Sequence, residues 1–267
     1  MLVIPHGTAM PLNKLWTSFY TIVAKDVVRM TRIWPQTFLP SVVTSVLYFL
    51  VFGSIIGGRI GEVDGFSYMH FIVPGLVMLA VVTNSFSNVA STFFASKFFS
   101  RNIDEILVSP TPPWVLIAGF VGGGMVRGIT VGILVLIVSL FFALPPLTNL
   151  PIVGLFLLLS SMIFSLAGLV NGIYAKNFDE VTIVPTFVLT PLVYLGGVFY
   201  SVSVLPHVWQ IFTYFNPIFY LINGFRYGFL GIADAPVSAS VVVLLALAGV
   251  LLAVNWYLVK TGLGLKQ

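Results

Sequence analysis

The sequence predicts an all-α polytopic membrane protein with six transmembrane helices. Of its 267 residues, 58% are hydrophobic and only 7% are charged, whereas a soluble domain carries about 25% charged residues. Long segments such as 241–254 are apolar at every position. A membrane β-barrel would instead alternate apolar and polar residues along each strand, so the pattern favours helices.

Several chemistries have no support in the composition. The chain has no cysteine, so a disulfide framework, a thiolate metal site and a cysteine nucleophile are all excluded. The three histidines, at positions 6, 70 and 207, share no ligand spacing, and we expect no metal site. No GxxxxGK[ST] loop is present, so we expect no ATP site in this chain. The net charge of +4 does not indicate nucleic-acid binding.

The N-terminal part predicts a surface helix over residues 13–34. Its apolar residues follow helical spacing, and four basic residues are interleaved with them: Lys14, Lys25, Arg29 and Arg32. Such a helix lies in the membrane interface and contacts lipid. A plain soluble helix or a disordered leader are the alternatives. Pro35 should end the helix.

Six apolar segments follow, and each is long enough to cross a bilayer. The predicted spans are 38–56, 71–90, 115–142, 151–174, 181–200 and 238–259. The third is longer than the bilayer requires, which predicts tilt or projection beyond it. Asp179 and Glu180 precede the fifth span and should cap it or contact a partner. No low-complexity linker divides the chain, so residues 1–267 are expected to form one domain.

The distribution of Lys and Arg predicts that both termini are cytoplasmic. With that orientation, Arg59 and Arg226 are outside and Arg127 lies within a span. The remaining nine are inside: Lys14, Lys25, Arg29, Arg32, Lys97, Arg101, Lys176, Lys260 and Lys266. Cytoplasmic loops carry an excess of Lys and Arg, so this asymmetry sets the orientation.

Residues 191–231 are apolar but broken by glycine and proline. We expect 203–225 to form two short helices that re-enter the membrane from outside without crossing it, with Pro206 and Pro217 at their starts. Gly196, Gly197 and Gly224 would permit the bends. Trp209 suits the interfacial level. We interpret the segment, with Arg226, as an outer gate; a static plug is the alternative.

Two motifs resemble ABC-2 type permeases, specifically their NodJ-like and YadH-like branch. One is LGGVFYSVSVLP followed by NPIFYLINGFRYGFLG, within 191–231, and the other is KFFSRNIDEILVSPTPP, over 97–113. The second resembles the coupling helix that fits a groove on the ATP-binding subunit. The resemblance assigns ATPase coupling to Arg101, Asp104, Glu105 and Leu107. A solvated juxtamembrane loop is the alternative.

The resemblance implies the membrane subunit of an ATP-driven exporter in a bacterial inner membrane. Two permease copies, expected to form a homodimer, would work with two ATP-binding subunits, which would hold ATP and Mg²⁺. This chain would then carry no catalytic residue and no cofactor. The implied substrate is amphiphilic or bulky: a glycan, a lipid-linked glycan, a lipid or a drug.

Polar residues inside the spans are candidates for the transport path. They are Asn84, Asn88, Arg127 and Asn171. Polar groups in lipid usually face protein or water, so interhelical hydrogen bonds are an equal alternative. Arg127 should either extend to the inner surface, which we favour, or pair within a polar path. Glycines 124, 128 and 132 line one helix face and predict close packing within the chain rather than between copies.

An ion-coupled secondary transporter is the alternative function. It would need acids within the membrane for proton or sodium binding. All eight acids are expected in loops or in the surface helix: Asp26, Glu62, Asp64, Asp104, Glu105, Asp179, Glu180 and Asp234. This placement argues against ion coupling.

Overall fold

The structure is a computed structural model that describes residues 11–99 and 111–264. It is a helical bundle, and its described part contains six helical segments long and apolar enough to cross a membrane. They are α2–η1–α3 (Trp34–Ile60), α4 (Tyr68–Phe98), α6 (Pro113–Ser139), α7 (Leu150–Tyr174), α8–η2–α9 (Phe178–Leu195) and α12 (Val237–Thr261). The predicted fold class is confirmed.

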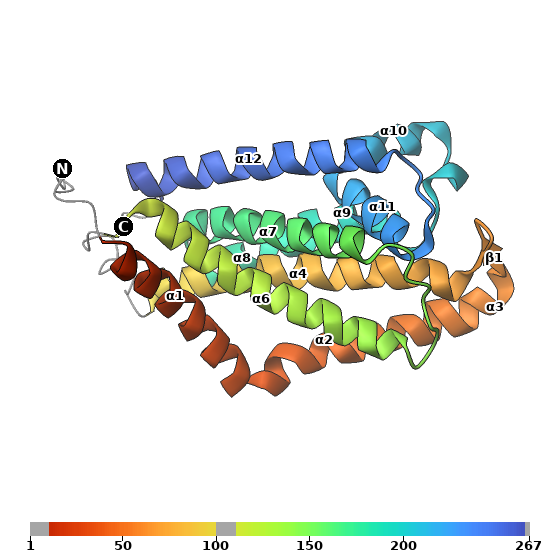
Figure 1. Ribbon diagram of the computed structural model, residues 1–267, viewed down its shortest axis with the longest axis horizontal. Helices are drawn as coiled ribbons and strands as arrows, with labels where there is room; N and C mark the ends of the chain where they lie inside the picture. Colours follow the sequence, from red (N-terminus) through yellow and green to blue (C-terminus); the bar gives the residue numbers. More distant parts are fainter. Residues whose placement is uncertain (1–10, 100–110, 265–267) are drawn as a thin grey trace.

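Helix α4 lies at the centre of the bundle, with α6 and α7 beside it (Figure 1). It extends beyond both ends of the predicted span 71–90, and residues 91–98 continue the helix instead of forming a loop. Its aromatic and aliphatic side chains, such as Phe71, Phe86 and Phe93, are buried. The other helices pack around this one apolar column.

Glycines bring α6 and α7 close to α4. Gly132 of α6 faces Val81, and Gly172 of α7 lies so near α4 that an added Cβ would be 2.9 Å from the carbonyl oxygen of Ala90. Small residues allow such close approach of helices where lipid supplies no hydrophobic driving force between them. Gly124 and Gly128 also face α4 or α7, which confirms packing within the chain as the use of this glycine row.

Two of the spans are irregular. The first consists of α2 (Trp34–Tyr48), the π-helical η1 (Phe49–Ile56) and α3 (Gly57–Ile60). The fifth consists of α8 (Phe178–Val184), the π-helical η2 (Pro185–Leu189) and α9 (Thr190–Leu195). Proline has no N–H to donate and disturbs the helical ladder, which explains the irregularity at Pro185. Asp179 and Glu180 lie in the first turn of α8, not in the loop before it as predicted.

Short elements close the end of the bundle that we call the hairpin end. Strands β1 (Glu62–Val63) and β2 (Phe66–Ser67) pair antiparallel, and their turn uses positive φ at Asp64 and Gly65. The residues between the first and second predicted spans are therefore largely ordered structure. The other end, which holds the start of α6 and the ends of α4, α7 and α12, is called the basic end (Figure 1).

The broken stretch also lies at the hairpin end. After α9 the chain turns at Gly197, whose φ is +84°, and continues through η3 (Val202–Val204), α10 (His207–Phe215) and α11 (Pro217–Leu230). The predicted helix starts at Pro206 and Pro217 are confirmed; the re-entry itself stays a prediction. Helix α11 extends past the predicted end at residue 225.

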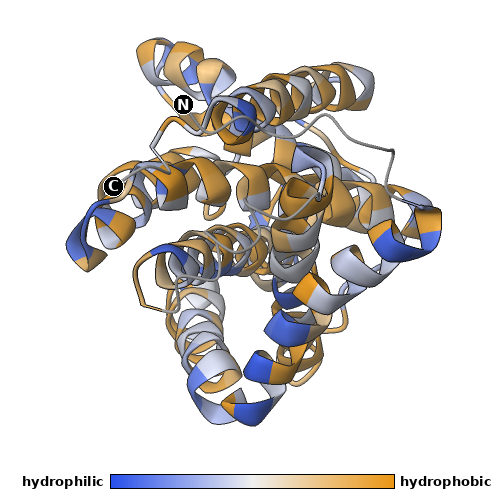
Figure 2. Ribbon diagram, turned by 90° about the vertical axis from the view of Figure 1, so that its left-hand side faces the viewer, coloured by the Kyte–Doolittle hydropathy of each residue, from blue (hydrophilic) through white to orange (hydrophobic). Residues whose placement is uncertain are grey.

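Gly224 does not bend the chain, so that prediction is wrong. It lies inside α11, and an added Cβ would overlap the ring of Phe156 on α7. Its absent side chain serves close packing of two helices. Figure 2 views the bundle from the basic end and shows ribbons that are hydrophobic over most of their length, with hydrophilic residues restricted to short stretches.

We predict that Gly168→Ala destabilises the bundle by about 1–3 kcal/mol, the usual cost of overpacking. An added Cβ would overlap the backbone carbonyl of Phe86, which cannot rotate away. Gly154→Ala, in the same helix α7, is the control, because nothing lies within 4 Å of its added Cβ. Thermal unfolding in detergent measures both. Equal stability of the two variants would contradict the close contact between α4 and α7.

Candidate functional site

Helix α1 (Leu12–Arg32) packs along α6 rather than lying apart from the bundle. The two helices approach closely at glycines of α6: an added Cβ on Gly119 would be 2.8 Å from Ile22, and one on Gly122 would be 3.1 Å from Val23. The predicted surface helix is thus confirmed in extent, over nearly the predicted range. One face is fixed to the spans, while the exposed face carries Trp16 and Tyr20.

A buried polar cluster joins α1 to α4 and α6. We call it the Asn88 cluster, and its members are Asp26 and Arg29 of α1, Asn88 and Thr92 of α4, and Arg127 of α6. Asn88 is at its centre and is 1% exposed. Three helices that are distant in sequence therefore share one hydrogen-bonded group.

Asn88 uses both halves of its amide. Its Nδ2 donates to Oδ2 of Asp26 at 2.6 Å, and its Oδ1 accepts from Arg29 at 3.0 Å and from Arg127 at 3.2 Å. An asparagine side chain has two donors and an acceptor oxygen with two lone pairs. It can therefore serve one carboxylate and two guanidinium groups together, which a carboxylate cannot do because it has no donor.

The cluster contains one negative and two positive side chains. Asp26 is 7% exposed and forms an ion pair of 2.7 Å with Arg29. Asp26 also lies against Gly123 of α6, where an added Cβ would press on its carboxylate. Burying a charge is expensive unless it is paired and hydrogen-bonded. The cluster meets this requirement for Asp26, and it carries a net positive charge.

Arg127 does not take the arrangement that the sequence favoured, and its place in a transport path stays a prediction. It pairs with Asn88 inside the protein instead of extending to the surface, which the sequence favoured. The reason is the neighbouring α4, whose Asn88 supplies an acceptor oxygen at 3.2 Å. The other path candidates make interhelical hydrogen bonds: Asn84 donates to Ser41 of α2 at 3.1 Å, and Asn171 donates to the carbonyl of Val181 at 3.0 Å.

Lys97 connects the C-terminal ends of three helices, α4, α7 and α12, at the basic end. Its Nζ donates to the carbonyl of Ile173, near the end of α7, at 2.9 Å, and also to the carbonyl of Gly264, after α12. A lysine near a helix C-terminus satisfies carbonyls that have no partner in the helix. The segment that follows Lys97 is thus anchored to the bundle at its start.

The predicted coupling residues Arg101, Asp104, Glu105 and Leu107 lie outside the described residues. The described flanks of the 97–113 motif belong to helices, because α4 ends at Phe98 and α6 begins at Pro113. In the next loop at the basic end, Asn177 caps α8 by accepting from the N–H of Glu180 at 2.9 Å. Glu180 in turn accepts from the N–H of Lys176 at 2.8 Å. The side chain of Glu180 therefore serves the helix start, which is one of the two roles predicted for the acidic pair.

Arg226 was expected in an outer loop, but it lies buried within α11 at 3% exposure. Its guanidinium is 3.6 Å from Asp234, donates to the carbonyl of Gly197, and has its Cζ 3.9 Å from the centre of the Phe71 ring. These contacts join α11 to the turn after α9, to the loop before α12 and to α4. Arg226 is a structural anchor, which limits any gate movement of α11.

Helix α10, unlike the buried Arg226 of α11, exposes large aromatic side chains. Trp209 is 49% exposed, and Phe212 and Phe215 are 61% and 84% exposed. Pro206 precedes α10 as its cap residue, and Gly196 ends α9 with an ordinary helical φ. The gate prediction stays untested, and α10 exposes aromatic side chains that α11 does not.

Sequence reasoning missed Asp26, Arg29 and Lys97 as linking residues. A signal for Asp26 was present, since it follows Phe19, Ile22 and Val23 at helical spacing and so belongs to the apolar face of α1. An acid on such a face requires a buried partner. The partner, Asn88, is 62 positions away, and no local pattern could indicate it. Within the two described ranges, no group of three His, Asp or Glu side chains is placed to hold a metal.

We predict that Asn88→Leu loosens α1 from the bundle. It leaves the charges of Asp26 and Arg127 without their shared partner, at a cost of about 1–3 kcal/mol. Thr83→Val is the control on α4, because the Thr83 hydroxyl bonds only to carbonyls of its own helix. A thiol introduced at Met30, which is 3% exposed, should react faster in Asn88→Leu than in Thr83→Val. Equal labelling rates would show that the cluster does not hold α1.

Comparison with known proteins gives the same assignment as the architecture. Residues 17–230 match the family model described as ABC-2 type transporter. The chain is 53% identical to the "Inner membrane transport permease YadH" of Escherichia coli over 256 residues, which cover 96% of this chain and 100% of the relative. It is 24% identical to "Nodulation protein J" of Rhizobium leguminosarum over 206 residues, covering 74% and 78%.

The family model spans most of the described bundle, from α1 to the end of α11. YadH is named as a transport permease, so this chain is a transport protein and not an enzyme. The six apolar helices agree with a multi-pass protein of the inner membrane. The chain belongs to the ABC-2 type transporter family, as an inner-membrane permease subunit that associates with an ATP-binding subunit.

Proposed function

We propose that the chain forms the path of an ATP-driven exporter and moves an amphiphilic or bulky substrate outward. The relationship to a transport permease over nearly the whole chain carries the proposal. In this proposal ATP and Mg²⁺ bind on the partner, two copies of this chain assemble with two ATP-binding subunits, and the chain itself holds no cofactor. The substrate is a glycan, lipid-linked glycan, lipid or drug, and the exposed aromatic side chains of Trp16 and Trp209 support this class.

The proposed orientation places the basic end in the cytoplasm. Among the described residues, the proposal places seven basic side chains on the cytoplasmic side: Lys14, Lys25, Arg29, Arg32, Lys97, Lys176 and Lys260. It places Arg59 and Arg226 on the outer side. The native chain has no cysteine, so single thiols report topology. Thiols at Arg59 and Leu147 should react with an impermeant reagent from outside, and one at Lys176 should not. The reverse pattern would contradict the orientation.

The coupling proposal assigns segment 97–113 to contact with the ATP-binding subunit. It is supported by the anchors on either side, because a contact transmits force only if its ends are fixed. Lys97 fixes the end of α4 to α7 and to the residues after α12, and α6 is fixed to α1 and α4. Movement of this segment would therefore be passed to the central helices.

The coupling experiment compares two charge reversals in reconstituted vesicles that contain the permease and its ATPase. Asp104→Lys with Glu105→Lys should abolish coupled export, or detach the ATPase, while the permease stays inserted. Two changes are used because an exposed ion pair contributes only about 0–1 kcal/mol. Glu62→Lys, an exposed charge reversal at the hairpin end, is the control. Normal assembly and export by the first pair would remove this segment from the interface.

An outer gate formed by α10 is the remaining part of the proposal. Its exposed aromatic face and the firm anchoring of α11 by Arg226 support assigning movement to α10 alone. Crosslinking α10 between two permease copies should stop export without affecting nucleotide binding on the partner. Export at the normal rate after crosslinking would favour the static plug.

Ion-coupled transport is the competing function, and Asp26 is the acid that bears on it, because its carboxylate is buried near the spans. That carboxylate is committed to Arg29 and Asn88, and it lies in the packed seam against Gly123. An acid that carries protons or sodium must instead release its partner in each cycle. Vesicles with permease but without the ATPase separate the two functions. Export driven there by an ion gradient would contradict the ATP-driven proposal.

A further inference from the structure

In the described bundle, the first and fifth spans are the two that contain a π-helical segment, η1 and η2. Both are loosely enclosed, because 17% of the apolar window of each is buried, compared with 72% in α4. A π-helical segment shifts the hydrogen-bond ladder, and helices bend at such points. Each of these spans therefore combines a point of bending with little packing, so a few side-chain contacts decide where it rests.

The turn that follows α9, residues 196–200, is a fixed part of the hairpin end. Arg226 of α11 donates to a carbonyl of this turn, and the hydroxyl of Tyr68, at the start of α4, donates to the carbonyl of Phe199 at 2.9 Å. The turn also lies close to α4, since a Cβ added to Gly75 would be 2.7 Å from one of its carbonyl oxygens. Helices α4 and α11 thus hold the turn in place.

Four aromatic rings join the first span to this fixed turn. We call them the Phe199 cluster, and its members are Tyr48, Phe52, Tyr194 and Phe199. The ring of Phe199 stacks on Tyr194 of α9, with 5.6 Å between the centroids. It also contacts Phe52 at 4.5 Å and Tyr48 at 5.8 Å, both from the first span. The cluster therefore connects the first span to α9 and to the turn through side chains.

A hydrogen bond of 2.8 Å between the hydroxyls of Tyr48 and Tyr194 completes this connection. Both tyrosines belong to segments that are long and apolar enough to cross a membrane, and Tyr194 is 38% exposed at the surface of the bundle. Hydrocarbon offers a hydroxyl no partner, so the two hydroxyls depend on each other there. Tyr48 is also the last residue before η1, so the bond holds the first span at the point where its ladder shifts.

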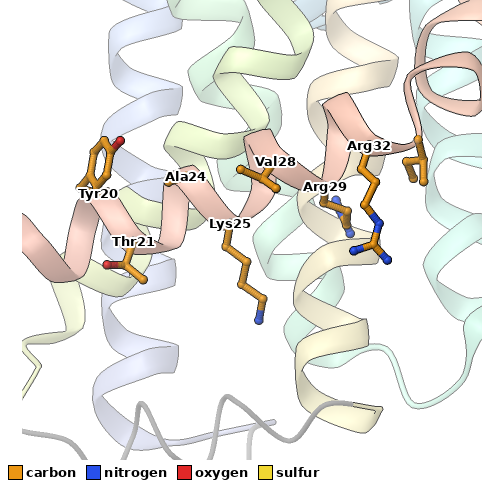
Figure 3. A pocket seen from close by; sticks show the side chains of 8 residues that line it. Tyr20, Thr21, Ala24, Lys25, Val28, Arg29 and Arg32 are labelled. Atoms are coloured by element: carbon orange, nitrogen blue, oxygen red, sulfur yellow. The ribbon is translucent and has the colours of Figure 1, made fainter.

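The opposite end of the first span is fixed as well. Only Ile33 separates α2 from α1, and Arg29, in the last turn of α1, belongs to the Asn88 cluster. Figure 3 shows Arg29 and Arg32 extending from this turn. The part of the first span that is free to move is therefore its hairpin-end half. There Gly53 of η1 lies against Met69 of α4, whose side chain an added Cβ would overlap.

We propose that the hydrogen bond between Tyr48 and Tyr194 is a latch that holds η1 and α3 against α4. Its release lets the hairpin-end half of the first span move away from the fixed turn, with the bend at η1. The latch concerns the first span and is distinct from the movement assigned to α10. It does not rest on the proposed export function; under that function, its release would widen the hairpin end of the bundle during transport.

The test measures how often η1 leaves α4, with a thiol introduced at Ile72. This residue is fully buried and faces Gly53 of η1, where an added Cβ would be 3.6 Å from its side chain. The native chain has no cysteine, so purified full-length permease in lipid nanodiscs reacts with a water-soluble methanethiosulfonate at this thiol alone. At low reagent concentration closing outpaces labelling, and the labelling rate is then proportional to the ratio of open to closed chains.

Tyr48→Phe and Tyr194→Phe each remove one hydroxyl and keep the ring. Either should raise the labelling rate of Ile72→Cys about threefold to tenfold, which corresponds to the loss of one hydrogen bond. Tyr220→Phe is the matched control, because its hydroxyl donates to the carbonyl of Tyr214 at 3.0 Å within the α10–α11 segment. It should change the rate by less than about twofold. Wild-type rates in both single variants of the latch would overturn the proposal.

Two further measurements separate release of the latch from general loosening. The variant with both Tyr48→Phe and Tyr194→Phe should label no faster than the faster single variant, because the two hydroxyls share one bond that is lost only once. Multiplied effects would show that the hydroxyls do not act as a pair and would overturn the latch. A thiol at Val153 of α7, which lies against Gly228 of α11, should keep its wild-type rate in every variant. Equal acceleration at Val153→Cys would mean that the whole bundle loosens, which also contradicts the proposal. Neither measurement uses the ATPase or transport.

Discussion

Polar groups buried in an apolar bundle must find their partners inside the protein, and the arrangement of this chain depends on that constraint. An unpaired buried polar group costs several kcal/mol where no water can reach it. Asn88 meets the constraint inside the bundle by serving Asp26, Arg29 and Arg127 together. At the hairpin end, the Nη atoms of Arg226 pair with Asp234 and the carbonyl of Gly197, although its Nε has no partner among the described residues. Each group joins helices that are far apart in sequence.

Close packing between these two groups makes the pairing geometry attainable. Glycines of α6 and α7 allow both helices to approach α4 almost backbone to backbone, as Gly128 and Gly172 show. Other glycines of α6 receive α1, so that Asp26 reaches Asn88. Helix α1 is thus part of the bundle on one face and exposed on the other. Under the proposed coupling, a movement at the basic end would therefore act on a connected set of helices.

The sequence predicted what local physics determines. Span number followed from apolar length, helix starts at Pro206 and Pro217 from proline chemistry, and the extent of α1 from its periodicity. It failed where distant residues decide. Arg127 was expected to reach the surface, and its actual partner, Asn88, lies on another helix where no local pattern indicates it. Gly224 was expected to bend the chain. Its actual role is to leave room for the ring of Phe156, which belongs to α7 and is distant in sequence. Arg226 was assigned to a loop because no local pattern shows its partners, which come from three separate segments.

The central claim is that the Asn88 cluster couples α1 energetically to the spans, and a double-mutant cycle tests it most directly. The free energy of unfolding in detergent is measured for Asp26→Ala, Asn88→Ala, the double variant and the wild type. Residues that share a buried network show interaction energies of about 0.5–3 kcal/mol. The account predicts a non-additivity in this range for the pair. Additive effects of the two substitutions, within measurement error, would contradict it.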